Sequence, residues 1–156
     1  MYFWKLDLLK KQLIAQGLTE AQMFSYMLVY VIFGAIAVEL VAYFPHESVD
    51  GWTYLVSALN ILIPAVGTVM AYRANGGASG SQFLARYVSI SLVSSIRYLA
   101  LLILMIIPLT IVAVVLAGSG DIIGGPVFEL LFAVTYAGLY LYITRHVRDV
   151  AAAQHS

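Results

Sequence analysis

The residues with the clearest chemical potential are two glutamates and an asparagine in apolar surroundings. Glu39 and Glu129 lie inside long apolar runs, and Asn60 lies inside another. A carboxylate in a membrane segment is costly and usually marks a pathway or a pairing with another group. One hypothesis is a cation or proton site near the outer mouth of a cavity, with Asn60 lining it. The other is that both glutamates reach the outer head groups, which their shallow positions favour.

Two short motifs match patterns of intramembrane proteases without the groups that complete the chemistry. Gly77-Ala-Ser-Gly80 has the form of a serine nucleophile motif, and Gly118-Ser-Gly-Asp121 has the form of an aspartyl protease signature. A serine nucleophile needs a histidine base, and an aspartyl protease needs a second aspartate in the membrane. The chain has no cysteine, and its histidines lie outside the apolar runs, at His46, His146 and His155. We therefore expect no enzymatic activity, no cofactor and no metal centre.

The elements that carry these residues follow from the composition. Hydrophobic residues make up 62% of the 156 residues and charged residues 10%, against roughly 45–50% and about 25% in soluble chains. Too few polar residues remain to cover a soluble surface, so we expect lipid to cover much of it. The balance of eight basic and eight acidic residues excludes a nucleic-acid binder driven by bulk positive charge.

Four apolar runs predict an all-α integral membrane protein, a single domain built as a four-transmembrane-helix bundle. The runs cover about 21–44, 52–72, 98–117 and 126–144. Each has the length of about 20 residues that a helix needs to cross a hydrocarbon core of roughly 30 Å. Thr19-Glu-Ala-Gln22 is a capping box that would begin the first helix.

Two further segments are expected to be helical on the inner side. Residues 2–16 predict an amphipathic interfacial helix, because apolar residues recur at helical spacing at Tyr2, Leu6, Leu9 and Leu13. The alternative is a cytoplasmic extension of the first span, although Gly17 offers a break. Residues 81–97 continue into the third span, and the combined helix is too long to lie within a bilayer. We expect 81–97 to project into the cytoplasm or to bend along the membrane surface.

The basic residues set the orientation of the spans. All eight fall before the first run, between the second and third, or after the fourth, and the loops 45–51 and 118–125 hold none. The positive-inside rule therefore places both ends of the chain in the cytoplasm. Anionic lipid head groups are the expected partners of six of these residues: Lys5, Lys10, Lys11, Arg73, Arg86 and Arg97.

The second run carries a face of small and polar residues at spacings of three and four: Ser57, Asn60, Pro64, Gly67 and Ala71. Such a face lets helices approach closely and form hydrogen bonds in lipid. It could hold the protein's own helices together, or it could bind a membrane-protein partner or a second copy.

The block from Tyr72 to Tyr87 resembles a segment of small bacterial inner-membrane proteins. Its Asn75-Gly76 pair also predicts a tight turn. The resemblance covers a short part of the chain, implies a multi-pass protein of the bacterial cytoplasmic membrane, and brings no activity with it.

Together these patterns favour a non-enzymatic accessory, regulatory or immunity protein that acts through helix packing with a membrane partner. The alternative hypothesis is a homo-oligomeric ion channel or small transporter that uses Glu39, Glu129 and Asn60. Four short spans rarely enclose a pathway alone, so this alternative requires self-association.

Overall fold

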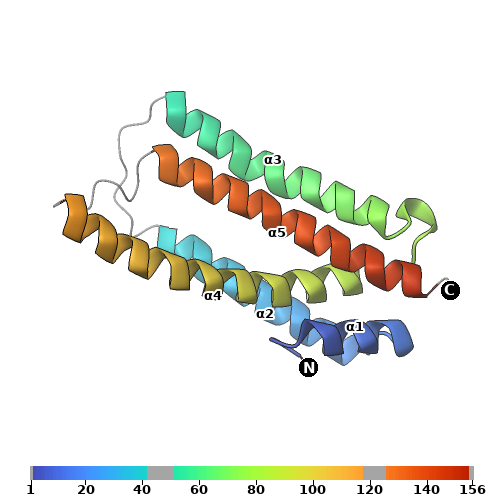
Figure 1. Ribbon diagram of the computed structural model, residues 1–156. Helices are drawn as coiled ribbons and strands as arrows, with labels where there is room; N and C mark the ends of the chain where they lie inside the picture. Colours follow the sequence, from blue (N-terminus) through green and yellow to red (C-terminus); the bar gives the residue numbers. More distant parts are fainter. Residues whose placement is uncertain (1, 42–50, 118–125, 155–156) are drawn as a thin grey trace.

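The computed structural model describes residues 2–41, 51–117 and 126–154. Within these ranges the chain is all-helical and has no strand, which confirms the predicted fold class at the level of secondary structure. The elements are α1 (Leu6–Ala15), α2 (Glu20–Val41), α3 (Gly51–Ala74), the short 3-10 turn η1 (Gly77–Ser79), α4 (Phe83–Ala117) and α5 (Pro126–Ala153). The long helices α2, α3, α4 and α5 run alongside one another, with α1 and both termini towards the same end (Figure 1).

The predicted capping box begins α2. The Gln22 backbone N–H donates to Thr19 Oγ1 at 3.3 Å, and the Thr19 N–H donates to Gln22 Oε1 at 3.2 Å. Gly17 precedes this cap with a φ of +73°, a backbone conformation that ends α1 and turns the chain. Because α1 and α2 are separate helices, α1 is not an extension of the first predicted span.

The connection between α3 and α4 contains the predicted tight turn. Gly76 has a φ of +100°, which favours glycine. A Cβ on Gly80 would lie 2.1 Å from the Asn75 carbonyl oxygen. The two glycines therefore allow the chain to fold back closely on Asn75, whose side chain is buried.

The buried core lies at the end of the molecule where both termini meet. α1 contributes the predicted apolar stripe, and its inward residues pack with apolar residues of α4 and α5. The stripe was predicted correctly, but the protein itself covers it, so little of it is left to face lipid. The buried core includes Leu6, Leu9, Leu13, Ile90, Leu92, Val93, Ile143, Val147 and Val150.

The segment 81–97 contributes the first turns of α4, which continues without a break through the third predicted span. With 35 residues, α4 is about 52 Å long at roughly 1.5 Å per residue. The first half of α4 is enclosed, because a consecutive stretch from Ser89 to Ser94 is buried among the neighbouring helices. From Phe83 onwards the segment is part of α4, and its residues Ser89–Ser94 lie in the buried core.

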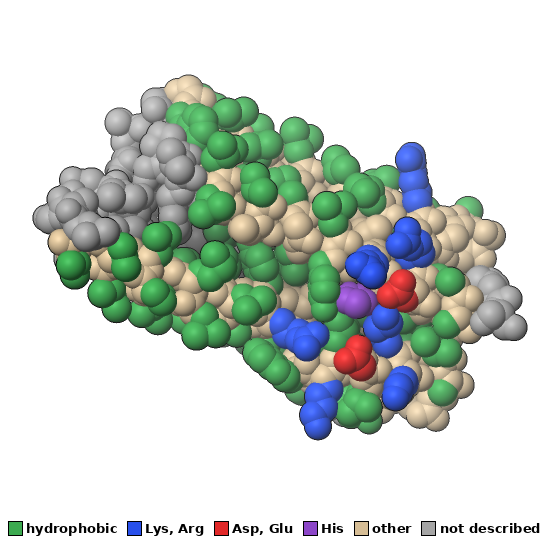
Figure 2. Space-filling view, viewed as in Figure 1, with side chains coloured by type: hydrophobic (Ala, Val, Ile, Leu, Met, Phe, Trp, Pro, Cys, Tyr) green, Lys and Arg blue, Asp and Glu red, His purple; other side chains and the backbone are tan. Residues whose placement is uncertain are grey.

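Away from this core the long helices expose large apolar side chains. Figure 2 shows hydrophobic side chains along the length of the molecule and charged side chains gathered over one end. By length and composition, Gly51–Ala74 and Phe83–Val112 are apolar enough to cross a membrane, and Glu20–Ile36 is a shorter apolar helix. The most exposed apolar side chains include Tyr54, Ile61, Leu104, Val115 and Val134.

α3 and α5 lie close together at Gly67. A Cβ added there would lie 2.4 Å from Tyr140 Cδ1 and 2.6 Å from Tyr140 Cβ. These atoms are near the backbone of α5, so the tyrosine cannot simply swing away. The absence of a side chain at Gly67 therefore sets how close the two helices lie.

We predict that Gly67→Ala destabilises the folded protein by about 1–3 kcal/mol, the usual range for overpacking. Gly34→Ala in α2 is the matched control, because a Cβ there meets nothing within 4 Å. Thermal unfolding in detergent checks both variants. An unfolding temperature of Gly67→Ala equal to that of Gly34→Ala would contradict the close contact.

Candidate functional site

Of the predicted site residues Glu39, Glu129 and Asn60, the structure describes the side chains of Glu129 and Asn60 only. Trp52 Nε1–H donates to Glu129 Oε2, which joins the first turns of α3 and α5. Asn60 lies exposed on α3. Glu39 lies in α2, but its side chain is outside those that the structure describes. In the same described part of the chain, no group of three or more histidine, aspartate or glutamate residues could hold a metal ion.

The predicted small-residue face of α3 divides into two halves. Gly67 and Ala71 are buried and Pro64 is half-buried, and α5 covers this inner half. Ser57 and Asn60 are exposed. The inner half therefore holds the protein together, and only the outer half is available to another molecule.

Arg86 lies inside the protein, where it cannot contact lipid head groups. The residue is 1% exposed, and its Nη1 donates to Asn75 Oδ1 at 2.7 Å while Nη2 donates to Gln154 Oε1. Gln154 Nε2 in turn donates to the Leu13 carbonyl at 2.9 Å. We call Arg86, Asn75, Gln154 and Leu13 the Arg86 network. It joins α4 to the α3–α4 connection, to the end of α5 and to α1.

Lys10 is also held by protein groups. Its Nζ donates to Asp149 Oδ2 at 2.8 Å and to His146 Nδ1 at 3.2 Å. These three residues fasten α1 to α5 at the charged end seen in Figure 2. Of the six residues expected to meet head groups, four remain accessible, at Lys5, Lys11, Arg73 and, half-buried, Arg97.

The pKa values of this cluster are shifted by its packing. Burial lowers the pKa of His146, and the charge of Lys10 lowers it further, while Asp149 opposes both effects. The hydrogen bond from Lys10 lowers the pKa of the Asp149 carboxyl. The cluster is therefore built for a neutral imidazole that accepts from Lys10 and for a charged carboxylate.

A pocket of about 640 Å³ lies between α4 and α5, and Trp4 of the N-terminal segment also lines it. We call it the α4–α5 pocket; its lining includes Trp4, Arg97, Leu101, Leu104, Leu139 and Tyr142. The lining is mostly apolar. Small residues from both helices, Ser94 and Gly138, leave the space open.

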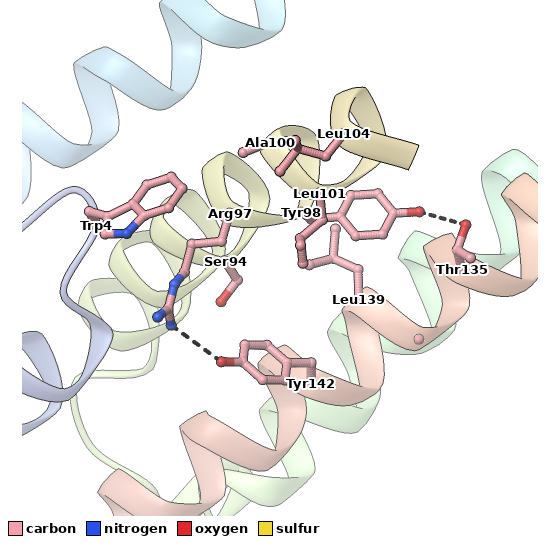
Figure 3. Close-up of a pocket in the computed structure, with 11 residues that line it drawn as sticks. Trp4, Ser94, Arg97, Tyr98, Ala100, Leu101, Leu104, Thr135, Leu139 and Tyr142 are labelled. Atoms are coloured by element: carbon pink, nitrogen blue, oxygen red, sulfur yellow. Dashed lines mark hydrogen bonds between the residues drawn. The ribbon is translucent and has the colours of Figure 1, made fainter. Parts of the chain in front are cut away.

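Figure 3 shows Arg97, Ser94 and Tyr142 together at one end of the pocket and the Tyr98–Thr135 pair at the other. Arg97 Nη1 donates to the Tyr142 hydroxyl at 3.5 Å. Further out, the Tyr98 hydroxyl donates to Thr135 Oγ1 at 2.8 Å, so this pair is satisfied within the wall. Ser94 is different, because its buried hydroxyl has no hydrogen-bond partner among the described residues.

The sequence predicted Arg97 at the inner membrane face, but it did not predict this pocket. Ser94, Arg97, Leu101 and Leu104 follow one another at spacings of three and four, so a stripe could have been recognised. Its facing partner on α5 depends on how the two helices pack. No family model, curated protein or solved structure matches the chain.

We predict that acidification releases α1 from α5. The unfolded pKa of His146 is 6.5 and the folded value is lower, so stability falls as pH drops below about 6.5. Asp149 stabilises the contact above its unfolded pKa of 3.8 and loses that effect as pH falls below it. Hydrogen exchange protection of α1 amides, measured from about pH 7 to about pH 5, should therefore decrease.

His146→Phe is the control, because it keeps a ring against Tyr142 and removes the titration. In this variant, the hydrogen exchange protection of α1 amides should not change between about pH 7 and about pH 5. Only the loss of the Asp149 contribution at lower pH should remain. Equal pH dependence in the two proteins would show that His146 does not control the contact.

Proposed function

We propose that this is a non-enzymatic, four-span protein of the bacterial inner membrane that acts by lateral helix packing with another membrane protein. The spans are residues 21–44, 52–72, 98–117 and 126–144, with both ends of the chain in the cytoplasm. An accessory, regulatory or immunity role requires only such a lateral contact. The uneven distribution of charge supports the orientation, because basic residues gather at one end of the molecule (Figure 2).

Helix packing supports four spans over two. α3 packs along α5, and α4 packs against both α5 and α2. A bilayer that surrounds α3 and α4 therefore also surrounds most of α5 and α2. The exposed apolar side chains on all four helices are suited to contact with lipid tails.

The observation that carries the lateral contact is the exposed amide of Asn60. At roughly 1.5 Å per residue, Asn60 is about 14 Å from the start of α3, near the middle of a hydrocarbon core of roughly 30 Å. Its neighbours Ile61 and Leu62 are 68% and 56% exposed apolar residues. Among the described residues, none forms a hydrogen bond with the side-chain amide of Asn60. An amide without a partner in lipid is costly, and a helix of another molecule would satisfy it.

A second copy of the chain is the partner in the alternative proposal, a homo-oligomeric channel or small transporter. The same exposed Asn60 would then face the interface or the lumen between copies. Glu129, which accepts a hydrogen bond from Trp52, would contribute a carboxylate to this site. Glu39, near the end of α2, would contribute the other. Self-association separates this alternative from a contact with a different protein.

We predict that Asn60→Leu weakens the lateral contact about threefold to tenfold, the range that interhelical hydrogen bonds in membranes supply. Ile61→Ala, at the adjacent exposed position, should leave it unchanged. Energy transfer between labelled copies in vesicles measures self-association, and quantitative recovery of co-purified proteins from native membranes measures other partners. If Asn60→Leu alters neither quantity, the proposed contact is wrong.

A further inference from the structure

We propose that the α4–α5 pocket binds an anionic phospholipid of the inner leaflet. One acyl chain lies against Leu101, Leu104 and Leu139, and the phosphate lies at Arg97. This inference depends on the membrane insertion proposed above. It adds a defined lipid site to a surface that would otherwise meet lipid without selection.

The shape of the pocket suits an acyl chain. Its volume of about 640 Å³ falls within the roughly 300–1,000 Å³ of ligand sites in proteins. The lining on α4 runs from Ser94 to Leu104, a rise of about 15 Å at roughly 1.5 Å per residue. The pocket thus follows the axis of α4, which is the direction of lipid tails around a spanning helix.

Arg97 supplies the positive charge at the inner end of the pocket. Its one described hydrogen bond, to the Tyr142 hydroxyl, is long at 3.5 Å, and no described carboxylate lies within ion-pair distance of it. Lys10 and Arg86, by contrast, already donate to protein acceptors. Arg97 therefore keeps its charge and most of its donors for a ligand, and a planar guanidinium suits phosphate oxygens.

Ser94 provides a second, independent indication of a polar ligand. The residue is 2% exposed, it lines the pocket, and its hydroxyl has no partner among the described residues. In Figure 3 this hydroxyl lies on the same side as the Arg97 guanidinium and the Tyr142 hydroxyl. A buried hydroxyl without a partner is costly, and an oxygen of a lipid phosphate or ester would accept a hydrogen bond from it.

Trp4 offers a direct reporter of what fills the pocket. The chain has two tryptophans, so Trp52→Phe leaves Trp4 as the only one. This background, carried by every variant, is placed in phosphatidylcholine vesicles. Phosphatidylglycerol or further phosphatidylcholine with brominated acyl chains is added at the same mole fraction. Bromine quenches the indole on contact, so brominated phosphatidylglycerol should quench Trp4 more strongly.

Three variants test the assignment. Arg97→Gln should lower the relative affinity for phosphatidylglycerol about fivefold to tenfold, the effect of losing one charge near the membrane surface. Arg148→Gln, which removes an exposed charge from the same end of the chain, should keep the preference. Gly138→Leu should reduce quenching by both lipids, because a Cβ there meets open space and a larger side chain fills the pocket.

The outcomes separate this proposal from the one on which it rests. Equal quenching by both lipids, or a preference unchanged in Arg97→Gln, overturns the lipid site in a protein that is still inserted. If both lipids quench Trp4 weakly and cross-linked copies protect Trp4 from quenching, a second copy covers the pocket. That result also overturns the lipid site. Protein that fails to sediment with the vesicles contradicts membrane insertion itself.

Discussion

The buried guanidinium of Arg86 joins the segments that meet at the end of the molecule where both termini lie. Its acceptors come from the α3–α4 connection and from the end of α5, and Gln154 passes the contact on to α1. Both acceptors are neutral amides, so the positive charge is stabilised by hydrogen bonds alone among the described residues. Removing Arg86 would leave the buried Asn75 amide without this partner, a loss that costs about 1–3 kcal/mol, while Gln154 is exposed. The network is one of three contacts that hold α1, beside the buried stripe of Leu6, Leu9 and Leu13 and the bond from Lys10 to Asp149.

The two parts of the molecule differ in their packing and in the polarity of their surfaces. The inner end has a packed core, a set of basic residues and the Lys10–His146–Asp149 cluster. Along the helices, apolar side chains face outward, and the contacts between helices are narrow, as at Gly67 and Tyr140. Such a surface is suited to an apolar environment. The α4–α5 pocket lies where these two parts meet, which is why it combines an apolar wall with a free positive charge.

Local signals predicted much of the fold. Thr19 and Gln22 cap α2 as expected, Asn75 and Gly76 form the expected turn, and the stripe on α1 has the expected period. These features depend on residues close together in the chain. Periodicity shows that a face is apolar, but it does not distinguish lipid from protein as its cover. The burial of α1 against α4 and α5 was therefore not predicted.

The candidate sites were less predictable, because they depend on packing between distant segments. Position in the sequence placed Arg86 and Lys10 with the other basic residues, yet their acceptors lie more than ten residues away. Glu129 could not be paired with Trp52 without knowing that α3 and α5 begin side by side. The expectation for Glu39 stays a prediction, since its side chain lies outside those described. The α4–α5 pocket required the relative placement of two helices and the N-terminal segment.

The central claim is that the chain crosses the membrane four times with its basic end in the cytoplasm. The protein has no cysteine, so single cysteines can report its topology directly. Ser48→Cys and Ser119→Cys lie in the two loops without basic residues, and Ala78→Cys lies in the α3–α4 connection. In intact spheroplasts, a membrane-impermeant maleimide should label positions 48 and 119, and it should label position 78 only after the membrane is opened. Labelling of position 78 in intact spheroplasts, or labelling of only one of the other two, would contradict the account.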